Sequence, residues 1–377
     1  MAKLQYMLFA WLSSWGAFLL CLSLRVQTSC DSGHTRIRKE LDISRLTTLE
    51  VEDYVRRQKK MRNGKAAIVI SVGATEQHGP TGLIGTDQLT AAAVASQVCN
   101  DCDVLLGPHL SVGMSLHHCQ FAGSTSLRPS TFVNMICDIV WSFQQSSNIT
   151  HFFFVNGHGG NVLPMKLAFA ILRNTAQNTE DNVVPWLIDS KNNVENNANT
   201  DDRGSGEPNI FKQHRRNPQE KHKYEFVSWY ANEDNQKLAK KLYGDKIGQH
   251  ATPDEISLTH YLFPEARKDS SLLNSRNVNR HTSGRTLRRL EGDNGGDETF
   301  NTLKLLLSSV HDERERDKLM ELGKFALSYM DPFDFKDRFR DGRMNSDPSL
   351  SSYEHGEELF STSTKAVARS LREFMET

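Results

Sequence analysis

The stretch that decides the fold is AAIVISVGATEQHGPTGLIGTD, residues 66–87. It opens with an apolar run rich in β-branched residues, 66–72, which is typical of a strand buried in a sheet. Gly73 ends the run, and three residues that can bind a metal ion follow it: Glu76, His78 and Asp87. Glu76 and His78 are two residues apart, so their side chains lie on the same side of an extended segment. A mixture of carboxylate and imidazole groups suits a divalent metal ion.

A similar arrangement recurs later in the chain as HFFFVNGHGGN, residues 151–161. An aromatic strand, 152–155, leads into His158 and its neighbouring glycines. Glycines let the backbone approach a ligand closely and leave amide groups free to bind oxyanions. The carboxyl ends of parallel strands meet at one edge of a sheet, where ligands bind. We therefore expect a metal site at that edge, with His158 close to the three residues of the first stretch.

Strands and helices alternate along the first half of the chain. Two further apolar runs predict strands at residues 103–106 and 183–188. Apolar residues at helical spacing, or alanine-rich composition, predict helices at 47–58, 89–98, 131–145 and 165–171. This alternation predicts an α/β fold, a three-layer α/β/α sandwich with a mostly parallel central sheet.

The second half of the chain is more polar. Polar surface insertions are expected near residues 190–223 and 267–297. Further helices are expected within 229–243, from Pro253 onward, and at 300–307, 318–329 and 367–374. The formal net charge of −1 gives no general attraction to nucleic acid. We therefore expect no nucleic-acid partner.

The N-terminus has a different composition. Residues 6–24 carry no charge and are flanked by Lys3 and Arg25. This is the layout of a signal peptide, and the run is also long enough to span a bilayer, for which about 20 residues are needed. We expect residues 1–30 to be a signal peptide or membrane anchor, followed by a linker at 31–45. The chain would then be secreted or membrane-anchored, and a bipartite organelle-targeting sequence is the alternative. In an oxidising compartment Cys99 and Cys102 can form a local disulfide, and two free thiols are the other interpretation.

Three blocks, GATEQHGPTGLIGTD, HHCQFAGSTSL and FVNGHGGN, resemble the signature blocks of the creatininase family of creatinine amidohydrolases and their relatives. RLTTLEVEDY, HATPDEIS and RMNSDPSLSSYEHG are supporting matches, and the resemblance covers roughly residues 44–263 and 332–375. It implies a creatininase-like metal hydrolase domain over residues 46–377. It also implies two divalent ions, with zinc expected first and manganese or iron as alternatives. The implied assembly is a homo-oligomer, usually a hexamer.

The activity that the resemblance implies is metal-dependent hydrolysis of a C–N bond in a small amide, formamide or cyclic amide. Glu76, Asp87 and His158 resemble the ligands of one ion, and His78 with the shared Asp87 resembles those of the second. His250 matches a family histidine that transfers protons near the scissile bond. A neighbouring carboxylate is the alternative for this proton transfer, and Glu255 is the second catalytic candidate. The substrate or oxyanion region would include Gly159, Gly160, Asn161, His118 and Lys246.

The sequence also departs from the family pattern. Creatininase completes its second metal position with a glutamate where this chain has Gly160, and Asp254 or Glu255 can replace it. Lys246 stands where creatininase has a tryptophan that covers creatinine. We therefore expect poor turnover of creatinine and a preference for an anionic amide, because lysine offers a charge but no stacking surface. A second interpretation is a catalytically impaired family member that acts as a binding or scaffold protein, which the altered HATPDE run and the two polar insertions favour.

Overall fold

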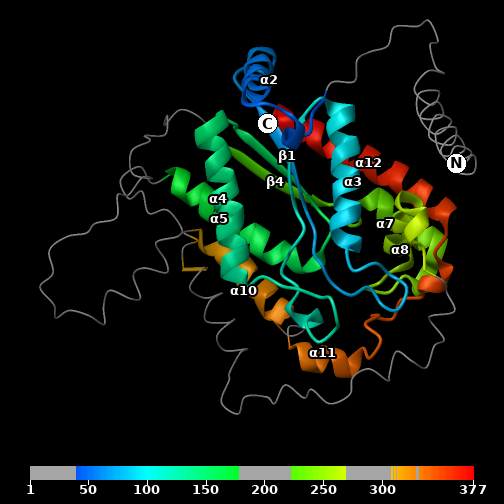
Figure 1. The fold of residues 1–377 in the computed structure, drawn as a ribbon. Helices are drawn as coiled ribbons and strands as arrows, with labels where there is room; N and C mark the ends of the chain where they lie inside the picture. Colours follow the sequence, from blue (N-terminus) through cyan, green and yellow to red (C-terminus); the bar gives the residue numbers. More distant parts are fainter. Residues whose placement is uncertain (1–39, 178–221, 269–306, 309, 311, 328–330) are drawn as a thin grey trace, which may run out of the picture. The chain divides into compact units, whose positions relative to one another are not determined.

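A parallel sheet forms the centre of the computed structural model (Figure 1). The structure describes residues 40–177, 222–268, 307–308, 310, 312–327 and 331–377. Within these ranges the strand order is β2-β1-β3-β4, and every neighbouring pair is parallel. The strands are β1 (Ala67–Val72), β2 (Leu105–Leu110), β3 (His151–Asn156) and β4 (Lys223–Ser228). The expected α/β class is confirmed.

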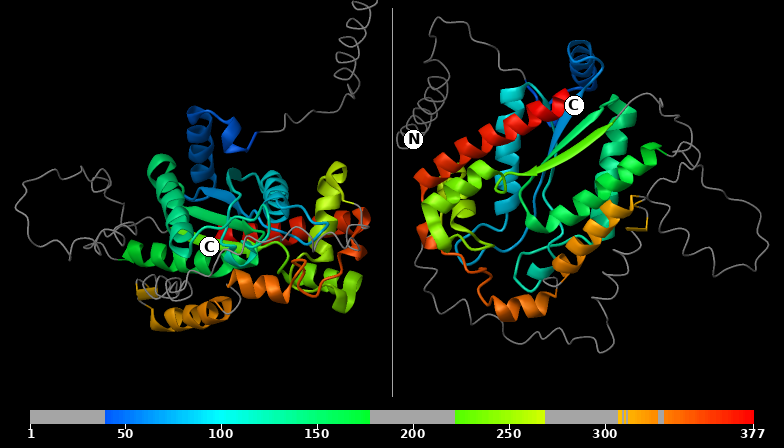
Figure 2. Two further views of the ribbon diagram at one scale, coloured as in Figure 1. Left: turned by 60° about the horizontal axis from the view of Figure 1, so that its bottom comes forward. Right: turned by 180° about the vertical axis from the view of Figure 1, so that it is seen from behind.

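Helices cover both faces of the sheet, which explains why β1 and β3 are buried at every position. Alternate residues of a strand point to opposite faces. Ile68, Ile70, Phe152 and Phe154 pack in one core with α2 (Thr48–Met61), α4 (Pro129–Ser147) and α5 (Val162–Gln177). Residues on the other face pack with α3 (Thr86–Cys102), α8 (Pro253–Leu262) and α12 (Tyr353–Glu376). Figure 2 shows these two helical layers on either side of the sheet.

The remaining described helices pack around this sandwich. α7 (Glu233–Tyr243) lies against α12, and α10 (Glu313–Leu327) lies against α5. The short helix α11 (Pro332–Arg338) contacts the 3₁₀ helix η2 (Leu116–His118). Within the described ranges, no helix combines the length and the apolar character that crossing a membrane requires.

Several elements differ in detail from the sequence predictions. β2 runs through Gly107 and Pro108 instead of ending before them, and an irregularity in its pairing with β1 accommodates the extra residue. Proline is tolerated there because β2 is an edge strand. α3 begins at Thr86, so Asp87 lies in its first turn and not ahead of it. Cys99 and Cys102 lie in α3 as free thiols, in agreement with the second of the two interpretations of this pair.

Some predictions fall outside the described residues. They are the N-terminal segment 1–30, the strand at 183–188, nearly all of both polar insertions, and most of the helix at 300–307. Leu41–Thr377 form one compact unit by themselves. The strand β4 was not predicted, although its sequence KYEFVS alternates between polar and apolar residues, a pattern typical of a half-buried strand and suited to the edge of the described sheet.

Candidate metal centre

The four predicted ligands meet at the carboxyl edge of the sheet. Glu76 and His78 follow β1, Asp87 lies in the first turn of α3, and His158 follows β3. Two glycines allow this approach. A side chain at Gly73 would collide with the backbone of Gln88, and one at Gly157 would collide with the carbonyl of Asp87. The glycine at each strand end therefore lets the loop lie directly on the start of α3.

One group of ligands consists of Glu76, Asp87 and His158, all of them buried. His158 Nδ1 lies 3.2 Å from Glu76 Oε1 and 3.2 Å from Asp87 Oδ2. Ligand atoms around a tetrahedral ion with bonds of about 2.1 Å lie roughly 3.4 Å apart. The observed spacing therefore suits three ligands of one ion.

The hydrogen bonds around His158 determine which of its nitrogens faces the carboxylates. His158 Nε2 donates to the carbonyl of Met114 at 3.0 Å, so Nδ1 carries the lone pair in the neutral ring. Glu76 Oε1 and Asp87 Oδ2 are buried and have no hydrogen-bond partner among the described residues. A lone pair and two carboxylate oxygens that face one another repel, and either a proton on Nδ1 or a metal ion between them relieves that repulsion. These residues therefore fit a divalent metal ion.

A second group consists of His78, Asp87 and Glu255. His78 Nε2 lies 3.0 Å from Asp87 Oδ1 and 4.0 Å from Glu255 Oε2. His78 Nδ1 donates to the carbonyl of Glu76 at 3.3 Å, so its Nε2 is the nitrogen available to a metal. Asp87 thus presents one oxygen to each group, as a carboxylate bridging two ions would. Of the two residues that can replace the missing glutamate, Glu255 joins this group and Asp254 does not.

The electrostatics of the ligands are strongly coupled. Burial opposes the charged form of Glu76, but His118 and His158 hold its pKa below the ordinary value. Burial likewise opposes the charged form of His78, but the adjacent Asp87 raises its pKa to about 10. The carboxylates also raise the pKa of His158, against the effect of burial. This environment attracts a positive charge, which a metal ion would supply in place of the protons.

Two acidic side chains at the start of α8 are in a different environment. Burial raises the pKa of Glu255 to about 7. Glu255 Oε2 accepts from the backbone N–H and the hydroxyl of Thr252, both at 2.8 Å, in a capping box. Burial also raises the pKa of Asp254, while hydrogen bonds from Thr252 and from the first amides of the helix act in the opposite direction. The capping box holds Glu255 toward the ligands.

His250 is the predicted proton-handling residue, and it lies beside both groups. Its Nδ1 is 3.7 Å from Glu76 Oε1, and its Nε2 donates to the carbonyl of Gln77 at 2.8 Å. Burial and the proximity of His78 lower its pKa to about 3, so the ring is neutral near pH 7. A neutral ring with an open Nδ1 can accept a proton or bind an ion, and Glu76, His78 and His250 form a third possible ligand group.

Gln77 connects the metal-binding loop to distant parts of the chain. Its Oε1 accepts from the N–H of Gly79, and its Nε2 donates to the carbonyl of Gly342 at 3.0 Å. The same nitrogen lies 2.8 Å from His118 Nδ1, to which it donates. The proton of His118 is therefore on Nε2, which faces Glu76 Oε1 at 3.5 Å. His118 thus places an N–H near Glu76 without a hydrogen bond to it, and it is not one of the grouped ligands.

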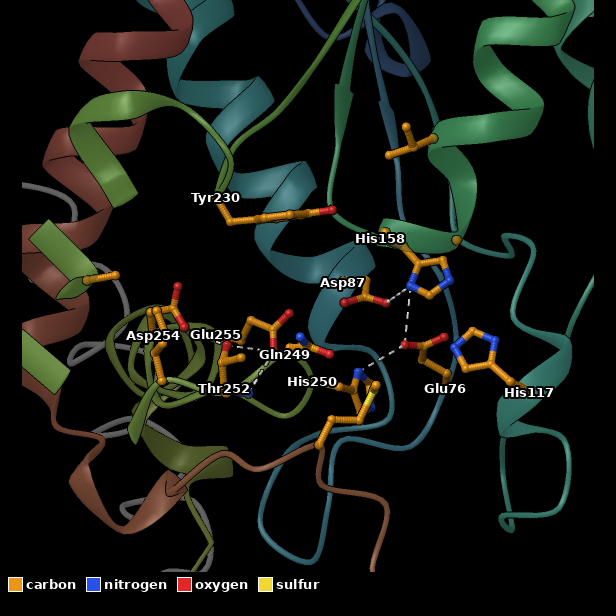
Figure 3. A pocket seen from close by; sticks show the side chains of 18 of the residues that line it. Glu76, Asp87, His117, His158, Tyr230, Gln249, His250, Thr252, Asp254 and Glu255 are labelled. Carbon is orange, nitrogen blue, oxygen red and sulfur yellow. Dashed lines mark hydrogen bonds and ion pairs between the residues drawn. The ribbon is translucent and has the colours of Figure 1, made fainter. Parts of the chain in front are cut away.

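A cavity of about 550 Å³ opens onto the ligands (Figure 3). It is lined by Gly159 and Gly160, which the sequence analysis assigned to the substrate or oxyanion region, and by the catalytic candidates His250 and Glu255. Asn161 does not line it, because its side-chain amide accepts from Met114 N and donates to Gly73 O. Its role is to tie the loop after β3 to the loop after β1.

Lys246 differs from its expected position. It is exposed at the end of the 3₁₀ helix η5 (Gly244–Lys246), and it is not among the residues that line the cavity. No lysine or arginine belongs to the described lining. We expected an anionic substrate because Lys246 was predicted to lie in the substrate region. Lys246 does not line the cavity, so it gives no reason to expect an anionic substrate.

Sequence reasoning missed several residues of the site. Ser115 Oγ donates to Glu76 Oε2 through a short hydrogen bond and so fixes that carboxylate. His117, Tyr230, Phe335 and Met344 line the cavity. His117 was not missed, because the sequence of the loop before Phe121 made His117 and His118 candidates for the rim of the pocket, with a surface-loop role as the alternative. The other three come from distant segments of the chain, and no motif marks them.

The fold and the ligand groups define a class of protein, an α/β/α sandwich with a candidate divalent-metal centre at the carboxyl edge of its parallel sheet. The sequence model described as "Creatinine amidohydrolase" matches residues 45–371. The chain therefore belongs to the creatininase family.

Curated relatives share part of the sequence. The chain is 35% identical over 112 residues to the mycofactocin precursor peptide peptidase of Mycolicibacterium smegmatis (strain ATCC 700084 / mc(2)155), a match covering 28% of this chain and 44% of that protein. It is 33% identical over 117 residues to the protein of the same name from Mycobacterium tuberculosis (strain CDC 1551 / Oshkosh), covering 28% and 46%. The chain thus spans less than half the length of these relatives in either match.

Solved structures share the fold over nearly the whole chain. A manganese form of creatininase superposes with a TM-score of 0.50 at 17% identity, covering 89% of this chain and 98% of that one. A zinc–zinc form of a creatininase mutant gives the same TM-score, identity and coverage. At this identity the likeness establishes the fold.

Proposed function

We propose that the protein is a metal-dependent hydrolase that cleaves a C–N bond of a small amide, formamide or cyclic amide. The observation that carries the proposal is the convergence of unpartnered buried oxygens of Glu76 and Asp87 on the lone pair of His158. His78 and Glu255 extend this cluster on the other side of Asp87. Family membership supports the hydrolase class.

The protein's own residues would hold two divalent ions, zinc first and manganese or iron as alternatives. Glu76, Asp87 and His158 would bind one ion, and His78, Asp87 and Glu255 the other. When bound, such ions activate water and polarise an amide carbonyl. The shared Asp87 fixes the spacing of the two positions, and the open cavity leaves room for water and substrate beside them.

The proton steps fall to His250 and Glu255. His250 is neutral near pH 7, its Nε2 proton is held by the carbonyl of Gln77, and its Nδ1 can accept a proton and return it to the leaving nitrogen. Glu255 borders the same cavity. The backbone of Gly159 and Gly160 also borders it and could donate hydrogen bonds to a developing oxyanion.

A short peptide is the second candidate substrate. The named relatives are peptidases that act on a precursor peptide, and the cavity of about 550 Å³ is within the usual range for ligands larger than a simple amide. The binding or scaffold role remains the alternative from a different class. Complete ligand groups favour the enzyme over that alternative.

The test is steady-state hydrolysis by the full chain loaded with zinc or manganese. A panel of linear amides, formamides, cyclic amides including creatinine, and short peptides would be compared with the same protein after chelation. We expect metal-dependent turnover of at least one class, lost in Asp87→Asn, and weak turnover of creatinine. Metal binding without hydrolysis of any compound would favour the binding role instead.

Location and assembly are separate proposals. We infer that residues 1–30 direct the chain to the secretory pathway, and that the domain forms a homo-oligomer, with a hexamer suggested by the family. A fluorescent fusion with and without residues 1–30 tests the first, with organelle import as the alternative outcome. Light scattering of purified protein tests the second, and a monodisperse monomer would contradict it.

A further inference from the structure

Asp254 is the one carboxylate among the described lining residues of the cavity that belongs to no ligand group. The described lining contains Glu76, Asp87, Asp254 and Glu255, and the other three are candidate metal ligands. Asp254 is 7% exposed, and its Oδ1 is buried without a hydrogen-bond partner in the described part of the chain. A buried carboxylate oxygen in this state is costly unless a positive group binds beside it.

The surroundings of Asp254 place it away from the metal ligands. In the view of Figure 3, Glu255 lies between Asp254 and Asp87. Gln236 and Ala239 of α7 and Ile247 also line the cavity. No lysine or arginine of the described lining is available to pair with Asp254. A cationic group of a bound molecule would meet no competing basic side chain in this lining, and it would offset the rise in the pKa of Asp254 that burial causes.

We propose that Asp254 is a specificity-determining residue that binds an ammonium or guanidinium group of the substrate. This rests on the proposed hydrolase function and narrows its substrate to amides or short peptides that carry a positive charge. The apolar side chains of Val162, Leu163 and Ile247 line the same cavity and would contact the carbon chain that links the charge to the scissile bond. Charge-assisted hydrogen bonds of this kind are among the strongest that a site can offer.

The test uses three probes with the same six-carbon chain: hexylamine, which is a cation at pH 7, neutral 1-hexanol, and anionic hexanoate. Calorimetric titration of the zinc-loaded full chain measures their affinities. We expect hexylamine to bind most tightly. Asp254→Asn should lower the affinity for hexylamine roughly 10- to 100-fold, the range for a hydrogen bond to a charged group. The affinity for 1-hexanol should not change.

Two further variants make the result decisive. Asp254→Glu keeps the charge and should keep the preference for hexylamine. Asp245→Asn removes a carboxylate whose side chain is 99% exposed, and should change nothing. Equal binding of hexylamine by the wild type and Asp254→Asn would overturn the proposal, because an amine bound to zinc would survive that change. A loss of zinc from Asp254→Asn without a change in preference would overturn it as well.

The outcome can be separated from that of the proposed function. If the charge preference holds but the zinc-loaded wild type hydrolyses none of the amides or peptides, the hydrolase proposal fails and the cation site stands. If hydrolysis occurs without any charge preference, the cation site fails alone.

Discussion

The two candidate metal positions share Asp87 but are built differently. In the first, Ser115 orients Glu76, and the carbonyl of Met114 orients His158. In the second, the Glu255 side chain is 14% exposed, and its Oε2 already accepts two hydrogen bonds from Thr252. The ion at the second position must therefore compete with Thr252 for Glu255 Oε2, whereas Glu76 Oε1 and Asp87 Oδ2 accept no hydrogen bond from the described residues. We therefore expect the first position to bind its ion more tightly, and the second to depend on free metal concentration.

The largest effect is expected from Asp87→Asn, because both positions lose their shared charge. Metal content after dialysis should fall below one ion per chain. Activity should drop by more than the roughly 10- to 100-fold that changes in supporting residues cost. Plasma emission spectroscopy measures the metal content. Asp101→Asn, at an exposed position of the same helix, is the control and should retain both ions.

Glu255→Gln should separate the two positions. Glutamine can keep the capping box with Thr252, so the helix should remain folded. The second ion should be lost and the first retained, which leaves one ion per chain and little activity. An unchanged content of two ions would mean that Glu255 is no ligand, and a content of zero would mean that the positions are not independent.

Gly160→Ala tests the first position through the backbone. An added methyl group would collide with the carbonyl of Met114 and with His158 Nε2. These two atoms form the hydrogen bond that fixes the tautomer of His158. We expect the first ion to bind roughly 10- to 100-fold more weakly. Gly159→Ala is the matched control, since its nearest contact would be the Tyr230 hydroxyl at 3.7 Å. Competition with a fluorescent zinc chelator measures the zinc affinity of each variant. Equal losses of affinity in Gly160→Ala and Gly159→Ala would contradict the geometric argument.

The smallest effect is expected from Ser115→Ala, which removes a single hydrogen bond to Glu76. Affinity for the first ion should fall by about tenfold, the lower end for supporting residues, while the second ion should be unaffected. The same chelator competition measures it. Ser142→Ala, at an exposed site on α4, controls for a general loss of stability. If Ser115→Ala lowered ion affinity more at the second position than at the first, Ser115 would not be a support of the first position.

The sequence predicted Glu76, His78, Asp87 and His158 as neighbours because a simple rule brings strand ends together at one edge of a parallel sheet. It left Asp254 and Glu255 as alternatives. A local signal could have decided between them, since Thr252 and Glu255 have the spacing of a capping box. That motif holds the Glu255 side chain at the start of α8, next to the ligands.

Other parts of the site could not be predicted in this way. Tyr230, Phe335 and Met344 reach the cavity from segments far apart in the chain, and their positions depend on how whole helices pack. Lys246 was assigned to the substrate region by counting residues back from His250. The turn at η5 instead leaves its side chain exposed outside the cavity lining, so alignment position alone misplaced it.

The bond from Gln77 to Gly342 has a consequence for biosynthesis. The two residues are 265 positions apart in sequence, and a side chain at Gly342 would collide with Gln77. The loop that carries Glu76 and His78 therefore reaches its final conformation only when residues near the end of the chain are available. Contacts of such long sequence separation form late in folding. A ribosome-bound chain from which Gly342 has not yet emerged should bind metal poorly, so loading of the centre would follow the emergence of that segment from the ribosome.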